Sequence, residues 1–139
     1  TKDSLPGIPT FNAGMVIASN IKAIGFQNAS GVRVLTEYAQ YFAPINNHEL
    51  MYQFQGLTDD DKYYVIAMLP INASFLPVDE KPDAVIPPDG VPLPANGNPP
   101  DETYYAAITQ KLEGNSAEAF IPSLNALDAL IQSITITSQ

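Results

Sequence analysis

Residues 48–70 of the chain, HELMYQFQGLTDDDKYYVIAMLP, have the pattern of two β-strands joined by an acidic turn. In the first strand, Leu50, Tyr52 and Phe54 alternate with more polar residues, as expected where one face is buried. The second strand, residues 62–69, is apolar on both faces, which indicates a central strand covered on both sides. Pro70 ends it, because proline has no N–H for the ladder. This stretch therefore predicts the centre of a sheet.

A hairpin is predicted upstream of that stretch. Residues 15–27 are rich in β-forming side chains, and residues 28–31 (NASG) form a turn signal in which Gly31 is free to adopt a positive φ. Residues 32–38 then alternate, with Arg33, Leu35 and Glu37 on one face. We interpret the face of Glu37 as polar, and expect Arg33 to pair with Glu37 or Glu49.

Two helices are predicted near the end of the chain. Asp101 is a suitable N-cap, and Gly114 is a natural stop after an apolar four-residue repeat. A second helix begins near Pro122 and carries the apolar stripe Leu124, Leu127, Ile131 and Ile134. Residues 134–137 are β-branched, which suggests a short strand. The fold class expected is α+β: an antiparallel sheet of four or more strands with the C-terminal helices packed on one face.

Proline divides the chain into segments. Residues 1–12 are interpreted as a linker or arm, and residues 13–139 as a single α+β domain with a proline-rich loop at 70–101, which holds nine of the thirteen prolines. Loops of this length are uncommon in compact domains unless they are functional or mobile. The alternative is that this loop packs over the sheet as a cap.

The composition excludes several functions. With a net charge of −9 and its six Lys and Arg residues scattered singly, the chain is a poor partner for nucleic acid. It contains no cysteine, no run long enough for a transmembrane segment and no signal peptide. The sequence begins at Thr1 without Met, which we interpret as a processed or truncated piece.

Candidate catalytic groups are few. No nucleophile motif, phosphate-binding loop or dinucleotide fingerprint occurs, so no cofactor is expected. Glu37 and Glu49 lie on candidate strands and form a candidate pair for glycosidase chemistry; the alternative is that both are exposed strand carboxylates. His48, the single histidine, is a candidate for a general base or a metal ligand; the alternative is a polar residue that closes a turn.

Two further groups of side chains are candidates for binding. Asp59, Asp60 and Asp61 place three carboxylates in one turn and are candidate calcium ligands, although they are contiguous and calcium-binding loops of the EF-hand type space their ligands at alternate positions. The alternative is a solvated hairpin tip. Tyrosines on a sheet beside a proline-rich loop could stack on sugars or hold a proline-rich peptide. The ligand-binding candidates are Tyr38, Tyr41, Tyr52 and Tyr64; the alternative is that such tyrosines belong to the core.

Three stretches resemble a known group. Residues 26–71 (FQNASGVRVLTEYAQYFAPINNHELMYQFQGLTDDDKYYVIAMLPI), 119–136 (AFIPSLNALDALIQSITI) and 5–14 (LPGIPTFNAG) resemble the C-terminal half of an uncharacterised family of exported, lipoprotein-like bacterial proteins. The resemblance transfers no catalytic motif. It implies an extracellular or cell-envelope location, with a lipid anchor and an N-terminal half that this chain lacks.

The function expected is therefore a non-catalytic exported domain that binds or scaffolds at the bacterial cell envelope. A saccharide or a protein at the envelope is the expected partner. The alternative is a carboxylate-dependent envelope hydrolase that acts on saccharides.

Overall fold

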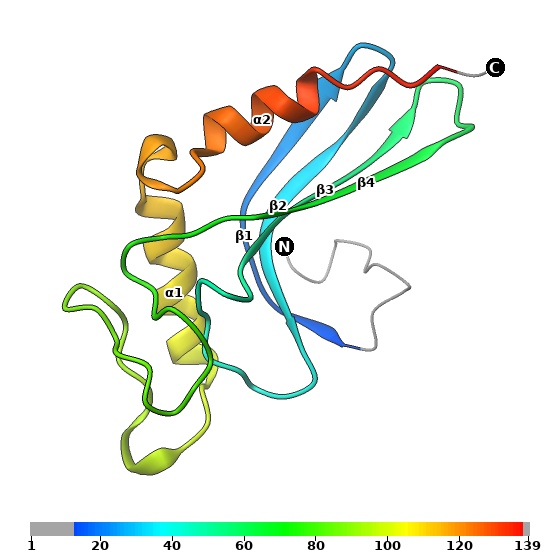
Figure 1. Cartoon of the computed structure of the whole chain (residues 1–139). Helices are drawn as coiled ribbons and strands as arrows, with labels where there is room; N and C mark the ends of the chain where they lie inside the picture. The colour runs from blue at the N-terminus through cyan, green and yellow to red at the C-terminus, as the bar shows by residue number, and fades with distance from the viewer. Residues whose placement is uncertain (1–12, 138–139) are drawn as a thin grey trace.

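A computed structural model of the chain describes residues 13–137. Four strands form one antiparallel sheet in chain order (Figure 1). They are β1 (Gly14–Phe26), β2 (Ala29–Ala39), β3 (Met51–Thr58) and β4 (Tyr64–Pro70). Two helices follow, α1 (Glu102–Gly114) and α2 (Leu124–Gln132), with single 3₁₀ turns at Ala95–Gly97 (η2) and Ala117–Ala119 (η3). Both helices pack on one face of the sheet, so the predicted α+β fold is confirmed. The arm predicted for residues 1–12 lies outside the described residues.

Each of the two helices begins at a residue whose side chain caps its N-terminus. The backbone N–H of Tyr104 donates to the Asp101 carboxylate at 2.9 Å, which caps α1 as predicted. The N-cap of α2 is Ser123, whose hydroxyl accepts from the N–H of Ala126 at 3.1 Å, one residue after the predicted start at Pro122. Among residues 13–137, no helix is long and apolar enough to cross a bilayer.

The core lies between the helices and one face of the sheet. Leu35, Tyr52 and Phe54 from the sheet are fully buried against apolar side chains of the helices, among them Ile108 and Ile131. Removing such side chains from water supplies most of the stability, at roughly 1.5–3 kcal/mol for each large apolar residue. The apolar alternation of β3 is therefore confirmed as the sheet side of the core.

Gly31 lies within β2 and not in the turn that precedes it. It pairs with Ile24 of β1 on one side and with Gly56 of β3 on the other, so its predicted role in a positive-φ turn is wrong. A Cβ at Gly31 would lie 2.0 Å from the carbonyl oxygen of Gln55 and 2.5 Å from Cα of Gly56. The backbones of β2 and β3 approach each other here because neither residue has a side chain.

Gly31→Ala is expected to lower the free energy of unfolding by about 1–3 kcal/mol, the usual cost of forcing atoms into a packed site. Urea unfolding monitored by circular dichroism measures this change. Gly14→Ala is the matched control, because a Cβ there meets no atom within 4 Å. Equal losses for the two variants would contradict the close approach of β2 and β3.

A buried ionic network joins α2 to the sheet. Arg33 of β2 donates through Nε to Oδ1 of Asp128 in α2 at 3.2 Å, and the hydroxyl of Tyr52 donates to the same oxygen at 2.7 Å. Arg33 also donates to the carbonyl of Asn20. The partner of Arg33 is thus Asp128, and the predicted pairing with Glu37 or Glu49 is wrong.

β4 is an edge strand of the described sheet, because it pairs with β3 alone. Tyr64 and Ile66 are 52% and 40% exposed, so the prediction of a central strand covered on both faces is wrong. An apolar run looks alike at the centre and at the edge of a sheet, and a tyrosine tolerates exposure because its hydroxyl can hydrogen-bond. The Tyr64 hydroxyl donates to the side chain of Gln55.

Two other local predictions are corrected. Residues 134–137 form no strand; instead Asn28 holds Ile136 with side-chain hydrogen bonds of 2.6 and 3.3 Å to its carbonyl and N–H. Glu37 lies on the helix-facing side of β2 and is 0% exposed, so the interpretation of that face as polar is also wrong. Its neighbours on that face, Arg33 and Leu35, are buried as well.

The proline-rich segment, residues 70–101, packs beside α1 and not over the sheet (Figure 1). Phe75 and Leu76 are buried in the core. The side chain of Asn47 accepts from the N–H of Ala73 at 2.8 Å and donates to its carbonyl at 3.0 Å. The N–H of Asn47 donates to the carbonyl of Pro77 at 2.9 Å. The segment is thus attached at several points to the turn before β3.

Candidate functional site

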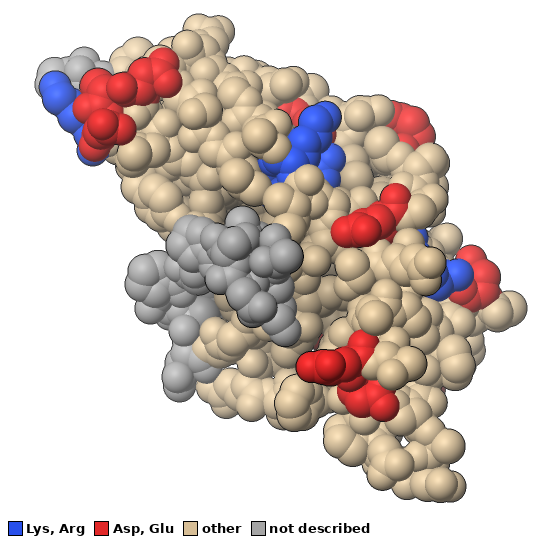
Figure 2. Space-filling view, turned by 180° about the vertical axis from the view of Figure 1, so that it is seen from behind, with Lys and Arg blue, Asp and Glu red and all other residues tan. Residues whose placement is uncertain are grey.

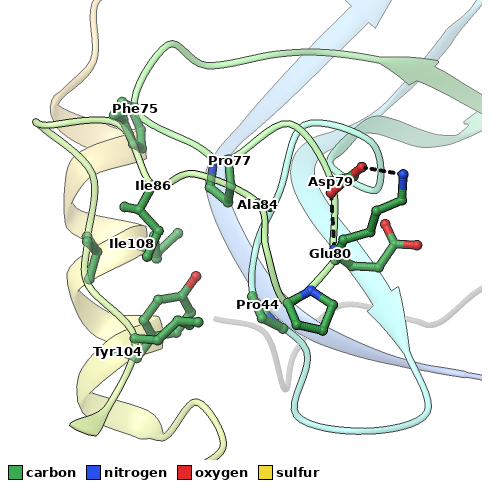
Figure 3. A pocket seen from close by; sticks show the side chains of 13 residues that line it. Pro44, Phe75, Pro77, Asp79, Glu80, Ala84, Ile86, Tyr104 and Ile108 are labelled. Atoms are coloured by element: carbon green, nitrogen blue, oxygen red, sulfur yellow. Dashed lines mark hydrogen bonds and ion pairs between the residues drawn. The ribbon is translucent and has the colours of Figure 1, made fainter. Parts of the chain in front are cut away.

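An apolar cavity of about 70 Å³ lies between α1 and the proline-rich segment (Figure 3). Tyr104 and Ile108 of α1 line it, together with Phe75 and Ile86 of the segment. The remaining lining residues are Pro44, Pro77, Pro82, Ala84, Val91 and Leu93, with Asp79, Glu80 and Lys81. We call this space the apolar cavity.

Hydrogen bonds fix the wall that α1 supplies. The hydroxyl of Tyr104 accepts from the N–H of Ile45 at 3.0 Å, and the hydroxyl of Tyr105 donates to the carbonyl of Ala43 at 2.7 Å. Burial raises the pKa of Tyr104 to about 12. Both tyrosines therefore tie α1 to the chain that leads from β2 to β3.

Charged side chains line one part of the apolar cavity. Lys81 Nζ lies 3.4 Å from Oδ2 of Asp79, and the N–H of Lys81 donates to Oδ1 of Asp79 at 3.1 Å. The backbone hydrogen bond from Lys81 holds the pKa of Asp79 below its usual value. Glu80 also has a lowered pKa, from its own backbone N–H and from the hydrogen bond with His48. Both carboxylates are thus ionised at neutral pH.

His48, Glu49 and Glu80 form a second group, which we call the His48 cluster. Nδ1 of His48 lies 3.3 Å from Oε1 of Glu49 and 3.3 Å from Oε2 of Glu80. Glu49 belongs to the turn before β3 and not to the strand predicted for it, because β3 begins at Met51. The side chain of Asn46 holds this turn by accepting from the N–H groups of His48 and Glu49, both at 3.0 Å.

Glu37 is the most perturbed carboxyl group of the site. Its Oε1 accepts from the N–H of Asn46 at 3.2 Å, while its Oε2 has no hydrogen-bond partner. Burial raises its pKa to about 8; the hydrogen bond from Asn46 opposes this, and the charges of Glu49 and Glu80 add to it. Glu37 is therefore largely protonated at neutral pH.

A second cavity, of about 140 Å³, brings several predicted residues together. We call it the acidic cavity. Its lining includes Glu37 and Glu49, which the sequence suggested as a pair, and Tyr38 and Tyr41. Glu80 lines both cavities, so the two adjoin through one side chain. No sequence signal pointed to Glu80, because it is a loop residue that the fold brings to His48.

The other candidate residues lie elsewhere. Tyr52 is 0% exposed and bound to Asp128, so it is not available to a ligand. Tyr64 is on β4. Asp60 accepts from the Thr58 hydroxyl at 2.7 Å and from the N–H of Lys62 at 3.1 Å, which favours the hairpin-tip interpretation of residues 59–61. Among residues 13–137, the one group of three ligands close enough to hold a metal ion is the His48 cluster, not Asp59, Asp60 and Asp61.

The surface charge does not suggest a nucleic-acid interface. Figure 2 shows the side of the molecule opposite to that of Figure 1, where lysine and arginine side chains lie in small, separate groups. Wide uncharged areas and carboxylates lie between them. On this face the described residues form no basic patch of the kind that phosphate backbones require.

Comparisons with known proteins give no relatives. The chain matches no protein-family model, and neither the curated proteins nor the solved structures contain one that is significantly similar to it. Function must therefore be inferred from the two cavities and the His48 cluster.

Proposed function

We propose that the protein is a non-catalytic binding domain whose apolar cavity takes an aliphatic chain that ends in a cationic group. The observation that carries this proposal is the lining of the cavity: apolar walls from α1 and the proline-rich segment, with the Glu80 carboxylate and the ion pair of Asp79 and Lys81 beside them. An aliphatic stem gains from burial, and an ammonium group gains from nearby carboxylates.

The size of the apolar cavity supports an aliphatic chain over a sugar ring. An apolar cavity of about 150 Å³ can hold a benzene ring. The cavity here has about half that volume, at 70 Å³, so it is too small for a ring and takes only part of a narrow aliphatic chain. The net charge of −9 also attracts a cationic ligand over a distance. A free amine and the lysine side chain of a partner polypeptide share this chemistry.

Binding of n-hexylamine, followed by NMR chemical shifts, tests the proposal. Ala84→Leu fills the cavity from a half-buried position and is expected to weaken binding about tenfold, or 1.4 kcal/mol. Val85→Leu is the matched control, because Val85 is 77% exposed and should leave binding unchanged. 1-Hexanol, which lacks the charge, should bind more weakly than the amine.

The ligand could be a free amine or the lysine side chain of a partner polypeptide. Binding of a lysine-containing peptide, compared with binding of its Nζ-acetylated form and of n-hexylamine, separates these two sources. Stronger binding of the unmodified peptide than of n-hexylamine supports a polypeptide partner. Binding of n-hexylamine that Ala84→Leu does not change, or no binding by any of these probes, would contradict the proposed function.

A hydrolase is the second candidate, because Glu37, with its pKa raised to about 8, shares the acidic cavity with Glu49. Binding is the better proposal, since Glu37 is 0% exposed and does not reach a saccharide in solvent. Location at the cell envelope remains a proposal that rests on the resemblance of residues 5–14, 26–71 and 119–136. Fractionation of cells that make the protein would test it.

A further inference from the structure

The His48 cluster has the donor spacing of a metal site. In tetrahedral sites, zinc lies about 2.0–2.2 Å from nitrogen and oxygen ligands, which places neighbouring donors roughly 3.3–3.5 Å apart. Nδ1 of His48 lies 3.3 Å from one oxygen of Glu49 and 3.3 Å from one oxygen of Glu80. The three donor atoms all lie within 4.8 Å of one another. Little movement is needed to place a small cation between them.

Hydrogen bonds hold both segments that carry the His48 cluster: the turn with His48 and Glu49, and the segment with Glu80. Asn46 fixes the backbone of His48 and Glu49 through two hydrogen bonds of 3.0 Å. Asn47, the next residue, attaches residues 73–77 to the same turn and so brings the segment that carries Glu80 alongside. Metal sites gain affinity when their ligands are positioned before the ion arrives.

A buried group beside the cluster provides a second, independent observation. Glu37 is 0% exposed, its Oε2 has no partner, and it lines the acidic cavity together with Glu49 and Glu80. A buried polar atom without a partner is rare in folded proteins. His48 does not line this cavity, so Glu37 adjoins the cluster through Glu49 and Glu80.

We propose that His48, Glu49 and Glu80 bind a divalent transition metal, zinc in particular, and that Glu37 supports the site from the acidic cavity. One imidazole and two carboxylates suit zinc, with a water molecule in the fourth position. Calcium fits less well, because it takes six to eight oxygen ligands and rarely uses nitrogen.

Isothermal titration of zinc chloride into the EDTA-treated chain tests this inference, with one ion per chain expected. Cobalt(II) gives a second readout, since a tetrahedral nitrogen and oxygen site produces intense visible absorption. His48→Ala is expected to weaken zinc binding at least about a hundredfold, and Glu37→Gln about tenfold, as for residues that support a metal ligand. Glu113→Gln, an exposed acid on α1, is the control and should change nothing.

The side chain of His48 is 66% exposed, so its removal should leave the melting temperature of the metal-free protein unchanged. Equal zinc affinity in the wild type and His48→Ala, or a stronger response to calcium than to zinc, would overturn the proposal. Glu80 lines the apolar cavity as well, so the variant Ala84→Leu separates this result from that for the proposed function. Ala84 is not a member of the His48 cluster, so Ala84→Leu should bind zinc normally while its binding of n-hexylamine is weakened.

Discussion

Asp128→Ala is expected to lower the free energy of unfolding by about 3–5 kcal/mol, the usual loss when one partner of a buried ion pair is removed. Asp128 accepts from both Arg33 and Tyr52, and each of these side chains is buried. Without the carboxylate, the guanidinium keeps its charge inside the protein with no counter-ion, and the Tyr52 hydroxyl has no acceptor. Urea unfolding measures the loss as a lower midpoint with an unchanged m-value.

A double variant separates the ion pair from simple loss of packing. Arg33→Met in the Asp128→Ala background removes the unpaired charge, so the double variant is expected to be more stable than Asp128→Ala alone. Glu113→Ala, on the exposed side of α1, serves as the surface control, with a change within about 0.5 kcal/mol. If the effects of the two buried substitutions simply add, the network is not what joins α2 to the sheet.

Glu37 is expected to make the protein less stable as the pH rises from about 4.5 to 8. These are the pKa of an ordinary glutamate in the unfolded chain and that of Glu37 in the folded protein. Between these values the folded state holds one more proton than the unfolded state, so the free energy of unfolding decreases with pH. The stabilisation that Glu37 contributes is present in full below pH 4.5 and is lost by about pH 8. Its full size is on the order of 5 kcal/mol.

Glu37→Gln removes this titration while keeping the shape of the side chain. The variant should match the wild type near pH 4 and exceed it in stability above pH 8. Denaturation in urea across this range, with EDTA present, gives the two curves. Asp60, Asp79 and Glu80 have lowered pKa values and act in the opposite direction at low pH, but they are common to both proteins.

The titrating groups that surround Glu37 are the same in the wild type and in Glu37→Gln. Glu49 and Glu80 raise the pKa of Glu37 through their charges, and the hydroxyls of Tyr104 and Tyr105 titrate at higher pH because burial raises their pKa values. Parallel curves for the two proteins would show that Glu37 is ionised in the folded protein at neutral pH.

The secondary structure could be predicted where local chemistry decides it. Asp101 and Gly114 mark the two ends of α1 in the sequence and in the structure, and Tyr52 and Phe54 mark the buried face of β3. Position within the sheet could not be predicted in the same way. The apolar run of β4 fits a central strand, but which strands are neighbours depends on the whole chain.

The candidate site could be predicted only in part, because its residues meet through the tertiary fold. The sequence suggests Glu37 and Glu49 as a pair, and both line the acidic cavity. Glu80 comes from an irregular segment whose path no local pattern determines. The burial of Asp128 could have been predicted from the sequence. Asp128 lies four residues after Leu124, on the apolar face of α2, and a carboxylate buried there needs a partner.

The proline-rich segment has a consequence for how the apolar cavity keeps its shape. Each proline holds φ near −65° and has no N–H to satisfy, so residues 70–101 have few conformations to lose and few donors to pair. Restricting the unfolded chain in this way lowers the entropic cost of ordering a long irregular segment. The cavity wall that the segment supplies therefore owes part of its order to the stiffness of the unfolded chain, in addition to contacts in the folded one.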